Sequence, residues 1–224
     1  MLRKNAGIVL TAVATMALSA AAHAQVIVQS FTVPSQAVSF SQSVSFNKFD
    51  TTLGILNSVT LSLSSSVTAE IDVFNFSGKT QSFSNATASV PVKITGPDGS
   101  NFTVTAVAGP ISGNVPAPLG ITPFVGQTAS NTGNSSIAPA NFGSYSGFGG
   151  GTLNMTFQGL NGTYAGTAPS GVGFGGSASA GGTLTITYNY TKIQPIPEPG
   201  SATFLAAGVL GSVGMGLRRR RKKA

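Results

Sequence analysis

The chain has 224 residues, no cysteine, no tryptophan and one histidine, and its formal net charge is +7. Without cysteine, the chain can form neither disulfides nor thiolate metal sites, and it has no cysteine nucleophile. Eight of its twelve Lys and Arg residues lie within the first four and the last seven positions. The remainder is close to neutral, which excludes nucleic acid as a partner, because phosphate binding needs clustered cations.

The N-terminus has the three parts of a secretory signal peptide. A basic start, Met1–Lys4, precedes the apolar run Ile8–Leu18, and a small-x-small pattern follows. We therefore expect residues 1–24 to form a signal helix that signal peptidase removes. Its removal would also take away the only histidine. The residues that define the predicted cleavage site are Ala22, Ala24 and Gln25.

Residues 25–194 form the body, in which apolar side chains recur at every second position. The longest such series runs over odd-numbered positions from Val59 to Val73, with Ser and Thr between them. Period two predicts half-buried strands, and no helical period interrupts the alternating runs. We therefore expect an all-β fold, an antiparallel β-sandwich, of which the jelly roll is one form.

A Pro-Asp-Gly turn joins two alternating runs in the middle of the body. The segment Gly96–Asn101 contains Asp98 directly before Gly99. Pro followed by Asp-Gly is typical of a hairpin turn. We interpret Asp98 as a residue that stabilises this turn and not as a ligand.

Two acidic residues, Glu70 and Asp72, share one face of the longest predicted strand. Two carboxylates that face the same way can help to bind Ca²⁺ or can work as an acid and base pair. The alternative is a solvated strand face. The apolar parity changes to even numbers at Phe74 and Phe76, which predicts a bulge or a strand end near Val73.

Residues 109–151 are rich in Gly, Pro, Asn, Ser and Thr. Such a composition predicts a long, mostly irregular segment that can contain short strands, and long loops in compact domains commonly bind a ligand or are disordered. Tyr145 and its aromatic neighbours are the candidate ligand residues there. The alternative is a loop whose phenylalanines pack under the sandwich.

The C-terminus has three parts in a fixed order. Residues 195–200 contain Pro-Glu-Pro, residues 201–217 are uncharged, and residues 218–224 carry six consecutive cations. Seventeen residues span about 25 Å as a helix, enough to cross the apolar layer of a bilayer. The cations stay on the cytoplasmic side, so the body is exported. An ordinary tail anchor would explain the last two parts.

This three-part end resembles the PEP-CTERM sorting signal of Gram-negative bacteria. The resemblance implies that an exosortase, a membrane-embedded transpeptidase, recognises Pro197, Glu198 and Pro199 and removes the helix and basic tail. It also implies that residues 201–217 are a transient anchor. The stop signal would be Arg218, Arg219, Arg220, Arg221, Lys222 and Lys223. The segments 49–61 and 182–190 are similar to the choice-of-anchor E domains that accompany such tails.

Three functions are compatible with these features. The first is a structural or adhesive protein of the cell envelope or extracellular matrix, which the resemblance links to exopolysaccharide or biofilm. The second is a surface module that binds carbohydrate or Ca²⁺. The third, a carboxylate-dependent hydrolase, is disfavoured because the mature chain has neither histidine nor cysteine to act beside its few carboxylates. We expect no enzymatic activity, no cofactor and no resident metal.

Overall fold

A computed structural model describes residues 24–193, which form one compact unit. We call this unit the body. The predicted Pro-Glu-Pro segment, transmembrane helix and basic tail lie outside the described residues, as does the predicted signal helix except for Ala24. Within residues 24–193, none of the helical segments has the length and hydrophobicity that crossing a bilayer requires.

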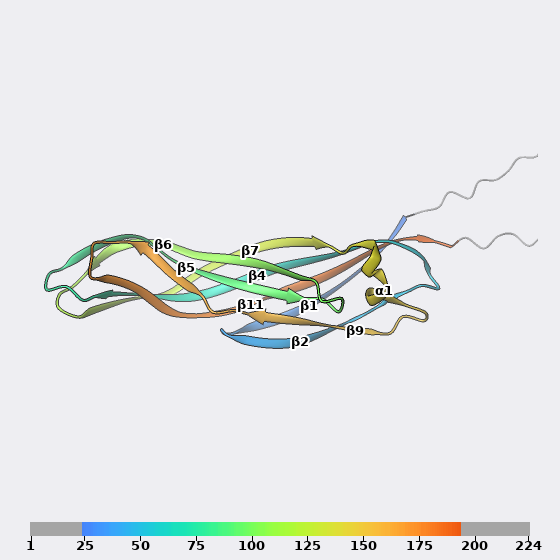
Figure 1. The fold of residues 1–224 in the computed structure, drawn as a ribbon, viewed down its shortest axis with the longest axis horizontal. Coiled ribbons are helices and arrows are strands. Elements are labelled where there is room, and N and C mark those ends of the chain that lie inside the picture. The colour runs from blue at the N-terminus through green and yellow to red at the C-terminus, as the bar shows by residue number, and fades with distance from the viewer. Residues whose placement is uncertain (1–23, 194–224) are drawn as a thin grey trace, which may run out of the picture. The chain divides into compact units, whose positions relative to one another are not determined.

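The body is built almost entirely of β-strands (Figure 1). The two short helical segments are η1 (Pro139–Asn141) and α1 (Phe142–Tyr145). The strands of the described residues are β1 (Ala24–Ala37), β2 (Phe40–Asn47), β3 (Phe49–Asp50), β4 (Gly54–Asn75), β5 (Gln81–Thr95), β6 (Asn101–Val115), β7 (Gly120–Ser136), β8 (Ser146–Gly147), β9 (Thr152–Gly159), β10 (Thr163–Thr167) and β11 (Val172–Lys192).

Two antiparallel sheets pack face to face and confirm the predicted all-β sandwich. The first sheet has the order β1-β11-β4-β7. In the second, β5 pairs with β6 along one edge and with β9 and β10 along the other, and β2 pairs with β9. Most consecutive strands cross from one sheet to the other, but β5 and β6 follow each other in the second sheet. The two-residue strands β3 and β8 form a separate parallel pair.

The centre of the first sheet is an unusually long antiparallel pair. Strands β4 and β11 have 22 and 21 residues and pair along almost their whole length. At about 3.3 Å per residue, such a strand spans about 70 Å. The body in Figure 1 is accordingly long and narrow, with its strands running lengthwise.

The pairing also defines the two ends of the body. At one end, which we call the proximal end, Ala24 pairs with Thr191 and Gly54 with Lys192. The first and last strands of the body therefore begin and end side by side. At the opposite, distal end, Asn75 pairs with both Gly120 and Val172.

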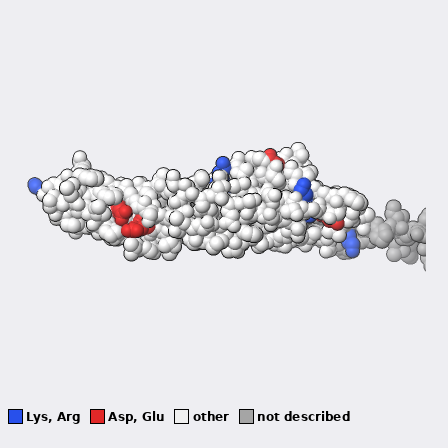
Figure 2. Space-filling view, turned by 90° about the horizontal axis from the view of Figure 1, so that it is seen from below, with Lys and Arg blue, Asp and Glu red and all other residues white. Residues whose placement is uncertain are grey.

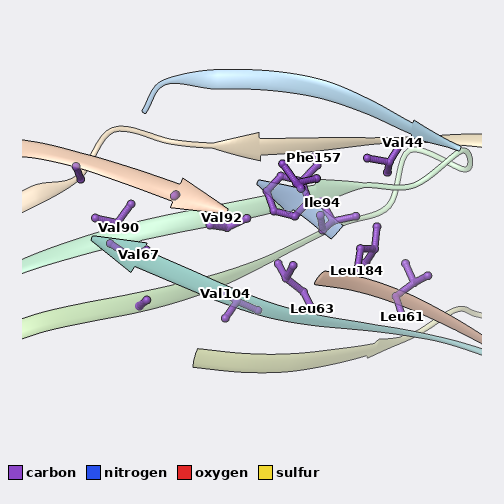
Figure 3. Close-up of a cluster of buried hydrophobic side chains, with 14 of the residues drawn as sticks. Val44, Leu61, Leu63, Val67, Val90, Val92, Ile94, Val104, Phe157 and Leu184 are labelled. Atoms are coloured by element: carbon purple, nitrogen blue, oxygen red, sulfur yellow. The ribbon is translucent and has the colours of Figure 1, made fainter. Parts of the chain in front are cut away.

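The core lies between the two sheets and follows the predicted alternation. Seven predicted inward positions of β4 have at most 3% of their surface exposed. Figure 3 shows how several of their side chains meet those of the second sheet. Burial of each Val, Leu or Ile side chain among them stabilises the fold by about 1.5–3 kcal/mol relative to exposure. The seven positions are Val59, Leu61, Leu63, Val67, Ala69, Ile71 and Val73.

The predicted loop over residues 109–151 is wrong for most of its length. Strand β6 continues to Val115, and β7 covers residues 120–136. Both strands lie at sheet edges. An edge strand tolerates proline and glycine because one row of its backbone groups needs no partner. The irregular part is confined to the connection 116–119 and to residues 137–151, which include η1 and α1.

Candidate functional site

The outer face of β4 near the distal end carries the candidate site. Glu70, Asp72 and Phe74 alternate with buried residues, so they point away from the core. Phe76 follows directly after the strand and is 66% exposed. Figure 2 shows acidic atoms gathered on this flank of a face that otherwise carries few charges. Two carboxylates and two aromatic rings thus follow one another along the surface.

The parity change at Phe74 and Phe76 is not a bulge at Val73, whereas the alternative prediction, a strand end near Val73, agrees with the end of β4 at Asn75. The odd-numbered positions remain buried up to Asn75, where the strand ends, and the register shift against β7 lies between Ala69 and Ile71. The two phenylalanines are therefore outward-facing residues. They are the site residues that our sequence reasoning missed, although their even numbers, shared with Glu70 and Asp72, were the signal that could have found them.

The rings of Phe74 and Phe76 are nearly parallel. Their planes differ by 9° and their centroids are 6.3 Å apart. Both rings lie over glycines of β11: a Cβ at Gly175 would come within 2.9 Å of the Phe74 ring, and one at Gly173 within 3.5 Å of the Phe76 ring. Glycine at these positions lets the rings rest on the neighbouring strand.

Three further exposed apolar side chains lie on β7 or directly before it, at the same end of the body. Ile121 pairs directly with Phe74 across β4 and β7. Ile121 is 59% exposed and Leu119 74%. Single exposed apolar residues are common, but several at one end of a domain favour an interaction surface. We call this group the distal patch, and its members are Phe74, Phe76, Leu119, Ile121 and Val125.

A hollow of about 220 Å³ lies beside Glu70. Hydroxyl groups and one carboxylate dominate its rim, from Thr68, Glu70, Ser177 and Ser179. Burial raises the pKa of Tyr164, and the negative charges of Asp72 and Glu70 raise it further. The tyrosine hydroxyl therefore stays protonated beside the acidic pair. The rings can stack on a ligand, and the hydroxyls and carboxylates can form hydrogen bonds with it.

Glu70 and Asp72 alone are too few ligands for a metal site. Among residues 24–193, no three side chains of the types His, Cys, Asp or Glu come together in a group that could hold a metal ion. Ca²⁺ takes six to eight oxygen ligands, so Glu70 and Asp72 would need several carbonyls, hydroxyls or waters in addition.

Tyr145 is not a surface residue, and the prediction that it forms a ligand surface is wrong. It is completely buried in α1, and its hydroxyl donates a hydrogen bond of 2.9 Å to Asp98 Oδ1. The reason is tertiary: a turn 47 residues away in the sequence supplies the acceptor. Burial raises the pKa of Tyr145, and the charge of Asp98 raises it further.

Asp98 has the predicted role in its turn and a second one beyond it. The backbone N–H and hydroxyl of Ser100 both donate to Oδ1, which is the predicted turn contact. Asn141 donates to Oδ2 at 2.8 Å. Burial alone would raise the pKa of Asp98, but the donors from Ser100, Tyr145 and Asn141 outweigh it and lower the pKa. Asp98 thereby holds η1 and α1 against the proximal end.

The sorting-signal residues lie outside the described part of the chain. This holds for Ala22 and for every residue of the predicted recognition element and stop signal. Ala24 and Gln25, which flank the predicted cleavage position, are the first residues of β1.

Comparisons with known proteins give no family for this chain. No family of known proteins matches it, and no curated protein matches it either. Among solved structures, the VP2 subviral particle of infectious bursal disease virus matches with 13% identity and a TM-score of 0.18, over 95% of this chain and 54% of that one. The Gx strain of the same virus matches with 14% identity and a TM-score of 0.17, over 76% of this chain and 38% of that one. The chain thus spans about half or less of the length of these proteins.

Proposed function

We propose that this chain is an exported structural or adhesive protein of the bacterial cell envelope or extracellular matrix, processed at its C-terminus by an exosortase. The observation that carries the proposal is the order of Pro-Glu-Pro, an uncharged segment and six cations at the C-terminus. The signal peptide pattern at the other end supports export. Signal peptidase, exosortase, the membrane and exopolysaccharide are the partners that this proposal requires.

The fold suits a body that is attached at one end. Its last strand, β11, ends at Lys192, five residues before Pro197. The attachment point is therefore the proximal end, where β1 also begins. From there the central strands extend for about 70 Å to the distal patch. Such a body would present its distal face far from the anchor.

A non-enzymatic role agrees with the chemistry of the body. Residues 24–193 contain no histidine and no cysteine, and only four carboxylate side chains. Asp98 and Asp50 are engaged at the proximal end, where Asp50 Oδ1 accepts from the N–H groups of Thr52 and Gly149. General acid and base catalysis needs groups with tuned pKa values, and only the outward-facing pair remains for it.

Carbohydrate binding by the distal face is the second candidate function. The near-parallel rings of Phe74 and Phe76, with Glu70 and Asp72 in line, favour it. Aromatic rings provide flat apolar surfaces, and carboxylates accept hydrogen bonds from hydroxyl groups. If binding of the carbohydrate depends on a metal ion, a Ca²⁺ ion held by the two carboxylates would supply it.

Mass spectrometry of the protein from its native host tests the first function. We expect the mature chain to begin at Gln25 and to end near Glu198. A Glu198→Ala variant should retain the six C-terminal cations, whereas Pro195→Ala, outside the recognition element, should be processed normally. A native protein that still begins at Met1 and ends at Ala224 would contradict the proposal.

A glycan array, probed with and without Ca²⁺, tests the second candidate. We expect binding that decreases at least tenfold, about 1.4 kcal/mol, in a Phe76→Ala variant. The matched control is Phe148→Ala, because Phe148 is 91% exposed but lies between β8 and β9, outside the distal patch. Equal binding by both variants, or no binding by the parent chain, would remove this candidate.

A further inference from the structure

The proximal end of the body carries exposed apolar side chains of its own. Among residues 24–193, eleven large apolar side chains are exposed, and six of them lie at or near this end. A single exposed apolar residue needs no explanation, but a group at one end of a domain favours contact with another apolar surface. The six residues are Val26, Val28, Leu53, Ile55, Phe148 and Ile193.

Two of these residues belong to neighbouring loops. Leu53 lies in the connection 51–53 between β3 and β4, and Phe148 lies in the connection 148–151 between β8 and β9. The parallel pairing of β3 with β8 brings the two connections together. Both lie at the end of the body where β1 begins and β11 ends (Figure 1). Phe148 is 91% exposed, the largest fraction among the eleven residues.

Hydrogen bonds tie the two loops to each other. Asp50 Oδ1 accepts from the N–H of Thr52 at 2.9 Å and from the N–H of Gly149 at 3.0 Å. The N–H of Thr51 donates to the carbonyl oxygen of Gly147 at 3.1 Å. Backbone groups that are paired within the protein lose no hydrogen bond to water when they approach an apolar layer.

The chain continues from this same end toward the uncharged segment 201–217. Lys192 is the last residue of β11 and pairs with Gly54, so Ile193 follows at the end where the two loops lie. Seven residues separate Ile193 from Ser201, where the uncharged segment begins. At about 3.5 Å per residue, even a fully extended chain covers only about 28 Å from Ile193 to Ser201. If residues 201–217 cross a bilayer, as proposed above, the proximal end therefore stays close to the bilayer surface.

We propose that the two proximal loops insert the side chains of Leu53 and Phe148 into the interfacial layer of the bilayer. The partner of this apolar surface is thus a lipid surface, and the inference rests on the membrane anchor of the proposed function. Removal of apolar side chains from water is favourable, and amphipathic segments enter the boundary between headgroups and acyl chains for this reason. Ile193, 58% exposed at the same end, adds to the apolar area.

Charged groups limit the depth of this insertion. The carboxylate of Asp50 accepts hydrogen bonds from both loops, and Lys192 is exposed at the end of β11. Charged groups are costly in the apolar layer. We therefore expect these two groups to remain among the lipid headgroups, while the side chains of Leu53 and Phe148 reach the acyl chains.

Insertion would also limit the distance between the recognition element and the membrane. Pro197 follows Ile193 by four residues, which cover at most about 14 Å. An inserted proximal end would therefore keep Pro-Glu-Pro within reach of a membrane-embedded exosortase. This deepens the proposed function, because it gives the body a part in presenting the processing site.

Tryptophan fluorescence tests the inference with the full 224-residue chain, which contains no tryptophan of its own. A Phe148→Trp variant is reconstituted into phosphatidylcholine vesicles with its body outside, and flotation measures whether the chain is anchored. Bromine atoms on the acyl chains quench the emission only if the tryptophan ring reaches them. The matched control is Phe76→Trp, because Phe76 is also exposed but lies at the distal end.

We expect brominated lipids to reduce the emission of Phe148→Trp by at least about half and to leave that of Phe76→Trp unchanged, since only the first ring enters the interfacial layer. A second change in the same chain, Leu53→Asp, should lower the quenching of Phe148→Trp, because a carboxylate resists insertion. Val107→Asp should leave the quenching unaltered, since Val107 is an exposed apolar residue in the middle of β6, away from the two loops.

Three results would overturn the inference. Unquenched emission of Phe148→Trp in a chain that floats with the vesicles would show that the body is anchored but does not insert. Equal quenching of Phe148→Trp and Phe76→Trp would show that the proximal loops are not the part of the body that meets the bilayer. A chain that does not float would contradict the anchor itself, and with it both the proposed function and this inference.

Discussion

At the proximal end Asp98 accepts hydrogen bonds from Ser100, Asn141 and Tyr145, whereas at the distal end Glu70 and Asp72 point outward beside exposed rings. The proximal aromatic residue, Tyr145, is completely buried, but distal Phe76 is 66% exposed. The same residue types thus stabilise the fold at one end and form a surface at the other.

This difference separates what substitutions should do at the two ends. At the proximal end, a buried group and its partner depend on each other, and loss of either leaves an unsatisfied group or a cavity. At the distal end, outward side chains contribute little to folding, so their replacement should change ligand binding and leave stability nearly unaltered.

The largest effect is expected from Tyr145→Ala. This change removes a buried ring and leaves Asp98 without one of its donors. We expect the free energy of unfolding to fall by about 3–5 kcal/mol, as for other large-to-small core substitutions. Urea denaturation followed by circular dichroism measures it. The control is Tyr164→Ala, because the side chain of Tyr164 is only partly buried. An equally large loss of unfolding free energy in Tyr164→Ala would contradict the proposed difference between the two ends.

Asn75→Ala should have the next largest effect, because Asn75 is a buried distal residue whose hydrogen bonds stabilise the fold. Its amide donates to the carbonyls of Lys79, Val115 and Pro116. Their loss should cost about 1–3 kcal/mol. The same denaturation measurement applies. Asn57→Ala removes one exposed hydrogen bond to Thr191 and should lower the free energy of unfolding by at most about 0.5 kcal/mol. Equal losses in the two variants would contradict the structural role of Asn75.

Acid should destabilise the body through its proximal carboxylates. The hydrogen bonds of Asp98 and Asp50 lower their folded-state pKa values below that of the unfolded chain. A lowered folded pKa contributes stability that is present above the unfolded pKa, about 3.9, and is lost as the pH falls through the folded pKa. Urea midpoints from about pH 6 to about pH 2 should show this loss, and Asp98→Asn should reduce it. An unchanged acid profile in Asp98→Asn would contradict the assignment.

The smallest effect on stability is expected from Phe76→Ser at the distal patch. The side chain is 66% exposed, so the free energy of unfolding should change by at most about 0.5 kcal/mol. Binding on a glycan array should nevertheless decrease, because one ring of the Phe74 and Phe76 pair is lost. A large loss of stability would show that Phe76 belongs to the core and not to a surface.

The strand pattern could be predicted where local alternation and tertiary burial agree. The odd-numbered apolar residues from Val59 to Val73 are all buried, and Asp98 accepts the turn hydrogen bonds expected of it. Both features depend on residues close in the sequence. Strand alternation and Asp-Gly turn chemistry are local signals of this kind.

Features that depend on distant partners could not be predicted. The second half of β6 and the whole of β7 look like a loop by composition, because only their edge position in the sheets makes glycine and proline tolerable. Tyr145 looked like a surface residue because its acceptor, Asp98, lies 47 positions earlier. The even positions of Phe74 and Phe76 were interpreted as a change in which face of the strand is buried. That interpretation assumes that apolar residues face the core, which fails at an exposed patch.

The central claim is that the body is attached to the membrane at its proximal end. Fluorescence resonance energy transfer to a labelled bilayer tests it most directly. The chain has no cysteine, so a single cysteine at Leu53, near the start of β4, or at Gly78, in the distal connection, can carry the donor dye. With acceptor lipids in the same vesicles, we expect strong transfer from position 53 and little from position 78, which lies about 70 Å further along the strands. Equal transfer from both positions, or stronger transfer from position 78, would contradict the account.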